Sequence, residues 1–111
     1  LMAARLKQAE LFLGQEQLDE MYKELGGFHG LMDNTLAFLN ASDRDSGKVL
    51  NNFKRLEIGL RQFRPRLELI RRSIPSEYEP YLRSLIQYVR DAREKAVEPL
   101  FGDSVVPRVR T

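Results

Sequence analysis

Apolar residues recur along most of the chain at alternating spacings of three and four. The clearest run falls on one helical face between residues 46 and 74: Val49, Phe53, Leu56, Leu60, Phe63, Leu67, Ile70 and Ile74. This spacing predicts a helix over 46–74 that buries that face. Pro65 lies inside the run, but the apolar positions keep their phase on both sides of it. The pattern therefore predicts a kinked but continuous helix that stops at Pro75.

Residues 76–98 repeat the same spacing and predict the last helix. Its apolar positions are Tyr78, Leu82, Leu85, Val89, Ala92 and Ala96. Ser76 and Glu79 have the spacing of a capping box at its start. Pro99 and Gly102 are expected to end it. The remainder, 102–111, has no helical period and is predicted to be a flexible tail.

Three glycines lie in the stretch ELGGFHG, and they raise the question of whether a loop interrupts the first long helix. Apolar residues seven apart run through this stretch without losing phase: Leu11, Leu18, Leu25, Met32 and Leu39, with Met21 and Phe28 between them. This favours one helix over 15–40; the alternative is two helices broken at Gly26–Gly27. Gly26, Gly27 and Gly30 lie away from the apolar face. They are either a glycine-tolerant solvent face or a close-packing strip that another helix backbone approaches.

Upstream, Met2, Leu6, Ala9 and Leu13 form a stripe on a different face, and the phase changes at Gly14. A short separate helical segment is therefore expected over 2–13. Short connections make consecutive helices antiparallel. The sequence predicts an all-α, up-down antiparallel bundle of three main helices (15–40, 46–74 and 76–98) plus this N-terminal segment, in a single domain over 1–101.

Composition narrows the function classes. The chain of 111 residues has no cysteine, which excludes disulfides, thiolate catalysis and cysteine-ligated metals. Its apolar runs are too short to span a membrane. Charge is unevenly distributed, because residues 1–42 hold three basic and six acidic side chains whereas residues 43–75 hold nine basic and four acidic ones.

The basic middle helix is the candidate interaction surface. Its cationic side chains lie mostly off the apolar face, and five of them form the candidate polyanion-binding set: Lys54, Arg55, Arg61, Arg64 and Arg72. One interpretation is a footprint for nucleic acid or another polyanion. The other is that the basic face pairs with the acidic N-terminal part or stays solvated, and this one is favoured because no aromatic residues alternate with the arginines.

Candidate catalytic and metal chemistry is sparse. His29, the only histidine, has Asp33 four residues later, and two such ligands are too few for a transition metal without others. A structural histidine beside the apolar face is the favoured interpretation. The segments around residues 43–48 fail the tests for a phosphate loop and for a calcium loop. No catalytic residue, metal or cofactor is predicted, and the protein is not expected to be an enzyme.

Two segments, FKRLEIGLRQF (53–63) and PSEYEPYLRSLIQYVRDA (75–92), carry a resemblance to a family of small helical bacterial proteins. These proteins are found notably among Acidobacteria, are often exported, and have no assigned activity. The resemblance extends over about residues 15–102. It implies a helical hairpin core and a periplasmic or secreted location, and it supplies no catalytic residues. The proline of the middle helix and the three glycines of the first depart from the family pattern.

Two functional hypotheses follow. The first is a non-catalytic helical module with a structural or protein-interaction role, whose partner is another protein or a second copy of this chain. The alternative is a binder of nucleic acid or another polyanion through the basic middle helix. The apolar positions themselves are expected to form a close-packed core and not a cofactor pocket, since they include no histidine.

Overall fold

The protein is all-helical over the residues that the structure describes. The structure is a computed structural model that describes the backbone of residues 1–42 and 47–105, and the side chains of residues 1–42 and 47–98. Four α-helices and one 3₁₀ turn follow in order: α1 (Met2–Gly14), α2 (Leu18–Asn40), α3 (Gly47–Ser73), η1 (Ser76–Tyr78) and α4 (Glu79–Val105). The all-α class predicted from the sequence is confirmed.

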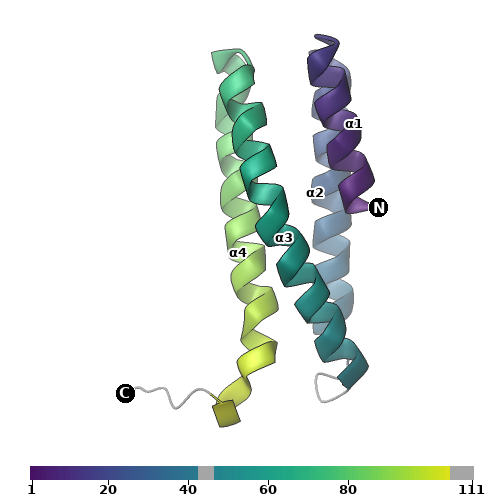
Figure 1. Ribbon diagram of the computed structural model, residues 1–111, viewed down its shortest axis with the longest axis vertical. Coiled ribbons are helices and arrows are strands. Elements are labelled where there is room, and N and C mark those ends of the chain that lie inside the picture. Colours follow the sequence, from purple (N-terminus) through teal and green to yellow (C-terminus); the bar gives the residue numbers. More distant parts are fainter. Residues whose placement is uncertain (43–46, 106–111) are drawn as a thin grey trace.

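The helices are arranged as two pairs. α1 packs along α2, and α3 packs along α4, whereas the two pairs touch one another at far fewer places. Figure 1 shows each pair joined by a short connection, with both connections at the same end of the molecule. The predicted three-helix bundle is not confirmed, because α1 is a full partner of α2 and not an appendage. Its stripe of Leu6 and Ala9 is completely buried, which explains this role.

One continuous core joins the two pairs. The apolar face of α3 is buried as the spacing predicts, at Phe53, Leu56, Leu60, Phe63, Leu67 and Ile70. Phe63 meets Phe28 of α2 edge to face, with ring centroids 5.3 Å apart. The face of α4 is buried at Leu82, Leu85, Val89, Ala92 and Ala96. The prediction that the apolar faces form a core is therefore confirmed at these positions, whereas Val49, Ile74 and Tyr78 of the predicted faces are only partly buried.

Polar contacts also hold the pairs together. The guanidinium of Arg66 on α3 donates two hydrogen bonds to the carboxylate of Glu10 on α1, at 2.9 and 2.6 Å. The Tyr88 hydroxyl on α4 donates to Asp33 on α2 at 2.5 Å. The predicted pairing of the basic helix with the acidic N-terminal part is thus observed, at one arginine.

α1 ends in a tight turn rather than at its glycine. The amide of Gln17 donates to the Phe12 carbonyl at 2.8 Å, and the amide of Glu16 donates to the Leu13 carbonyl at 3.0 Å. This is the hydrogen-bond pattern of a Schellman motif. Its left-handed residue is Glu16, with φ of 60°, and not Gly14. α2 therefore begins at Leu18, three residues after the predicted start.

α4 extends further than predicted. Its backbone stays helical through Pro99 and Gly102 to Val105, so the predicted end near residue 98 is wrong. Proline removes one backbone hydrogen bond and glycine costs about 1 kcal/mol in a helix, and neither is sufficient to stop this one. Residues 102–105 therefore belong to the helix, and the rest of the predicted tail, 106–111, lies outside the described residues. At the start of α4, Glu79 bonds arginines and not the predicted capping partner.

α2 is one helix through Gly26 and Gly27, as the continuous apolar spacing predicts. The alternative of two broken helices is excluded. Likewise α3 stays a single α-helix through Pro65.

The glycines of α2 give a paired stability test. Nothing lies within 4 Å of a Cβ added at Gly26, whereas one added at Gly27 would lie 3.1 Å from the guanidinium of Arg5. Gly26→Ala is expected to raise the free energy of unfolding by about 0.5–1 kcal/mol, because alanine loses less backbone entropy on forming a helix. Gly27→Ala is expected to raise the free energy of unfolding by a smaller amount, because Arg5 must then move away from Glu24. Arg5 donates a hydrogen bond to Glu24 at 3.2 Å. Urea unfolding of the two variants measures the difference, and a loss of stability at Gly26 would contradict this account.

Candidate functional site

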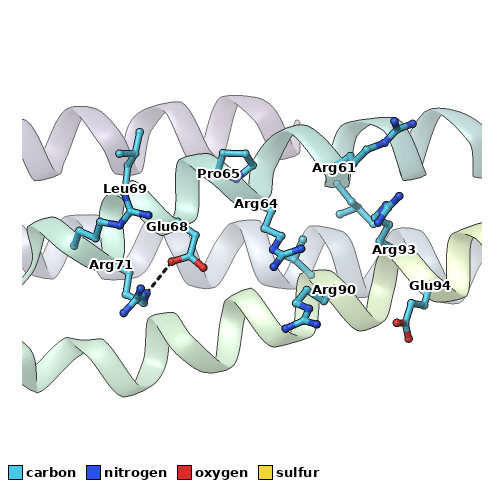
Figure 2. Close-up of a pocket in the computed structure, with 12 residues that line it drawn as sticks. Arg61, Arg64, Pro65, Glu68, Leu69, Arg71, Arg90, Arg93 and Glu94 are labelled. Atoms are coloured by element: carbon cyan, nitrogen blue, oxygen red, sulfur yellow. Dashed lines mark hydrogen bonds and ion pairs between the residues drawn. The ribbon is translucent and has the colours of Figure 1, made fainter.

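A groove of about 780 Å³ runs between α3 and α4 and is the candidate functional site. The described residues that line it are Leu60, Arg61, Arg64, Pro65, Glu68, Leu69, Arg71 and Arg72 on α3, and Val89, Arg90, Arg93 and Glu94 on α4. Six of these twelve side chains are arginines. Figure 2 shows that the labelled arginines come from both helices and that Arg64, Arg71 and Arg93 lie in the space between them. We call this site the α3–α4 groove.

The arginines meet here because of their position next to the apolar face. Arg61 and Arg64 each follow a buried residue of α3 by one position, and Arg90 and Arg93 do the same on α4. A residue one position after a core residue lies on a fixed edge of the helix. When two such helices pack side by side as a hairpin, these two edges adjoin. The same rule places Glu57 and Glu68 on the arginine edge of α3.

Three of the groove arginines are neutralised by carboxylates of α3 and α4. Glu57 accepts hydrogen bonds from Arg93 Nε at 2.7 Å and from Arg61 at 2.9 and 3.1 Å. Arg71 donates to Glu68 at 2.9 Å and to Glu79 at 3.0 Å. These arginines connect α3 to α4, and their charge is largely compensated by carboxylates of the protein itself.

The other three arginines are exposed and unpaired. Arg64, Arg72 and Arg90 have no ion-pair partner among the described side chains. In Figure 2, Arg64 extends from α3 into the space between the helices, and Arg90 lies on the opposite wall of the groove, on α4. Like charges that line one groove without ion-pair partners repel each other. An anion placed between them would relieve that repulsion. Glu94 is the one lining carboxylate that has no ion pair in the described structure.

Apolar surface lies among these charges. Leu60 and Val89 are buried beneath the groove, whereas Leu69 is 60% exposed and Pro65, four residues before it on α3, is also exposed. The groove therefore offers both cationic and apolar contacts. No aromatic residue is among the described residues that line it.

The pKa values of Glu57 and Glu79, which pair with arginines of the groove, are lowered, so these two carboxylates remain ionised at neutral pH. The hydrogen bond from Arg93, opposed by burial and reinforced by Arg61, holds the pKa of Glu57 below its ordinary value of 4.5. Hydrogen bonds from Arg83 and then Arg71 lower the pKa of Glu79 in the same way. The paired arginines accordingly stay neutralised at neutral pH, and the cationic character available to a ligand comes from Arg64, Arg72 and Arg90.

The structure divides the residues predicted for polyanion binding. Arg61, Arg64 and Arg72 line the groove, and the first of them is bound to Glu57. Lys54 and Arg55 are exposed nearer the start of α3 and do not line it. Sequence reasoning missed the contribution of α4, namely Arg90 and Arg93. Their position immediately after Val89 and Ala92 is the signal that would have found them.

The three glycines predicted as a close-packing strip, Gly26, Gly27 and Gly30, lie in different environments. The guanidinium of Arg5 on α1 lies over Gly27, so this position receives a side chain and not a helix backbone. Gly26 and Gly30 have nothing of the described chain within 4 Å of an added Cβ. Among the described residues, no backbone of another helix comes within 4 Å of a Cβ added at any of the three glycines.

His29 and Asp33 lie four residues apart on α2, and Tyr88 of α4 contacts both of them. The rings of His29 and Tyr88 meet edge to face with centroids 4.3 Å apart. Burial, followed by the hydrogen bond to Asp33, raises the pKa of Tyr88 to about 12, so it remains a donor at neutral pH. No group of three or more potential metal-ligating residues occurs in the part of the chain that the structure describes.

A second groove of about 480 Å³ lies where α1, α2 and α3 meet. Met2, Leu31 and Leu56 are among its lining residues, and Phe38 stands beside it with 70% of its surface exposed. Arg55, one of the predicted polyanion-binding residues, lines this groove instead of the α3–α4 groove. This second groove is more apolar than the α3–α4 groove, and its lining does not bring several unpaired charged side chains together.

Comparison with known proteins does not add a function to this geometry. No protein-family model matches the sequence, and neither a curated protein nor a solved structure is significantly similar to it. The resemblance to exported bacterial proteins and the periplasmic or secreted location therefore stay predictions. None of the helices searched in the described part combines the length and apolar character needed to cross a bilayer.

Proposed function

We propose that the protein is a non-catalytic helical module that binds an acidic segment of a partner protein in the α3–α4 groove. The observation that carries the proposal is the set of three unpaired arginines, Arg64, Arg72 and Arg90, around exposed apolar surface at Pro65 and Leu69. Cationic and apolar contacts at one site fit a ligand that presents carboxylates and apolar side chains together. Protein segments have this mixed character.

Nucleic acid is the second candidate, and the same arginines favour it. Arginine binds phosphate readily. Two features of the groove support a protein ligand over nucleic acid. Its described lining has no aromatic side chain on which a base could stack. Exposed Leu69 offers an apolar contact that a phosphate backbone does not use.

Paired charge variants test the site. Arg64→Gln with Arg90→Gln removes two unpaired groove arginines, and Lys54→Gln with Arg55→Gln removes the same charge from α3 outside the groove. The probe is a fluorescent peptide of glutamate, leucine and alanine, about 20 residues long, measured by anisotropy at low salt. The groove variant is expected to bind it about tenfold more weakly, which corresponds to about 0.7 kcal/mol for each exposed arginine. The control variant is expected to change the affinity by less than about threefold, because its effect is a screened, long-range one.

The same two variants separate the candidates when a DNA duplex is the second probe. Equal losses of peptide binding in both variants would mean that only net charge matters and would contradict the groove as the site. DNA binding that is tighter than peptide binding, falls steeply with salt and depends on the groove arginines would favour nucleic acid. Arg61 is not a suitable position for such a variant, because its replacement would also release Glu57.

A further inference from the structure

We infer that the segment bound in the α3–α4 groove is an amphipathic α-helix of the partner, with carboxylates about two turns apart and apolar residues between them. This inference rests on the proposed function and adds the conformation and the residue pattern of the ligand. It follows from the spacing of the groove arginines, from the apolar positions between them, and from the backbone hydrogen bonds of α3 and α4.

Two unpaired cations of the groove lie about two helical turns apart on α3. Arg64 and Arg72 are eight residues apart on the continuous helix α3, and both line the groove. At a rise of 1.5 Å per residue they are about 12 Å apart along the axis. A second helix lying along α3 places residues seven or eight apart on one face at about the same separation. Carboxylates at those two positions would reach both arginines.

Apolar contacts fit the interval between the two arginines. Pro65 and Leu69 lie between them in the sequence of α3, four residues apart, and both are exposed residues that line the groove. Apolar side chains three and four residues after the first carboxylate of a bound helix would cover them. Arg90 lines the opposite wall of the groove, so unpaired cations of both helices are available to the carboxylates of the ligand.

The walls of the groove favour a helix over an extended segment. Both walls are α-helices, whose backbone amides and carbonyls are bonded within each helix, and no strand edge lies beside the groove among the described residues. An extended ligand would lose water from its own backbone groups without a partner for them, which is costly. A helix satisfies these groups internally and packs between two helices at the usual axis separation of about 8–10 Å.

Three peptides of identical composition, each about 20 residues long, test the inference, because isolated helices shorter than about 12–15 residues are marginal. The first carries glutamates seven apart with leucines at the third and fourth positions between them. The second is a scrambled sequence that spreads the glutamates around the helix. The third keeps the order of the first but contains a D-amino-acid pair at its centre, which prevents a continuous helix.

The first peptide is expected to bind at least about tenfold more tightly than the other two, a difference of about 1.4 kcal/mol, and to gain helical circular dichroism on binding. Its advantage should disappear in Arg64→Gln with Arg90→Gln and persist in Lys54→Gln with Arg55→Gln. Equal binding of all three peptides that still depends on the groove arginines would overturn the helical ligand and leave the proposed function intact. Binding of every peptide that is indifferent to Arg64 and Arg90, or no binding at all, would overturn the proposed function itself.

Discussion

Leu60→Ala is expected to lower the free energy of unfolding by about 2–5 kcal/mol. Leu60 lies in the middle of α3 with no exposed surface, at the level where α3 meets α4. Truncation removes buried methyl groups and leaves a cavity, because a close-packed interior relaxes only partly. A loss of this size is a large fraction of the stability of a domain, which is typically about 5–15 kcal/mol. Urea unfolding monitored by far-ultraviolet circular dichroism measures it.

Leu69→Ala is the matched control for this experiment. It makes the same chemical change on the same helix at a side chain that is 60% exposed, and is expected to cost less than about 0.5 kcal/mol. A loss below about 1 kcal/mol for Leu60→Ala would contradict the packed core, since Leu60 would then line an open cavity or an interface in solution.

Glu57→Gln is expected to cost about 1–3 kcal/mol at neutral pH. Glu57 is only 7% exposed, and its carboxylate accepts hydrogen bonds from Arg93 and from both Nε and Nη2 of Arg61. Glutamine keeps the shape of the side chain but removes its charge and turns an amide donor toward the arginines. Both arginines are about half exposed and can be rehydrated, so the cost is smaller than for a fully buried ion pair.

The effect of Glu57→Gln is expected to depend on pH. Because the folded protein lowers the pKa of Glu57 below 4.5, the ionised carboxylate stabilises the fold at pH values above 4.5. This contribution is lost as the pH falls through the lowered pKa, when the carboxyl group becomes protonated. The difference in stability between the wild type and Glu57→Gln should therefore shrink below pH 4.5. Glu79 is present in both proteins, so its own lowered pKa cancels in the comparison. A difference that stays constant from neutral to acidic pH would contradict a charge-dependent role.

The apolar spacing predicts the helices and their buried faces because both follow from local periodicity. Phe53, Leu60 and Leu67 are buried as their spacing requires, and α2 runs through its glycines because the phase is unbroken there. Periodicity defines a face but does not define its partner. The sequence therefore did not reveal that α1 pairs with α2, or that α4 continues past Pro99.

The candidate site was predicted only in part, for a related reason. Counting basic residues along α3 identifies Arg64 and Arg72 as candidate binding residues, but it identifies Arg55 and Arg61 as equally good candidates. The spacing of four residues between Glu57 and Arg61 could have indicated their ion pair within α3. Only the packing of α3 on α4 shows that Arg93 joins this pair and that Arg90 lines the same groove as Arg64. These distinctions depend on which helix edges adjoin, and that is a property of the tertiary structure.

The most direct test of the α3–α4 groove as a binding site is residue-by-residue mapping by nuclear magnetic resonance. The ¹⁵N-labelled protein is titrated with the helical glutamate–leucine peptide, and chemical-shift changes are followed for backbone amides and arginine side chains. The account predicts changes concentrated at residues 61–72 of α3 and 89–94 of α4, with the Nε–H signals of Arg64 and Arg90 among the most affected. Changes concentrated instead around Phe38 and Arg55, or spread evenly over every exposed lysine and arginine, would contradict it.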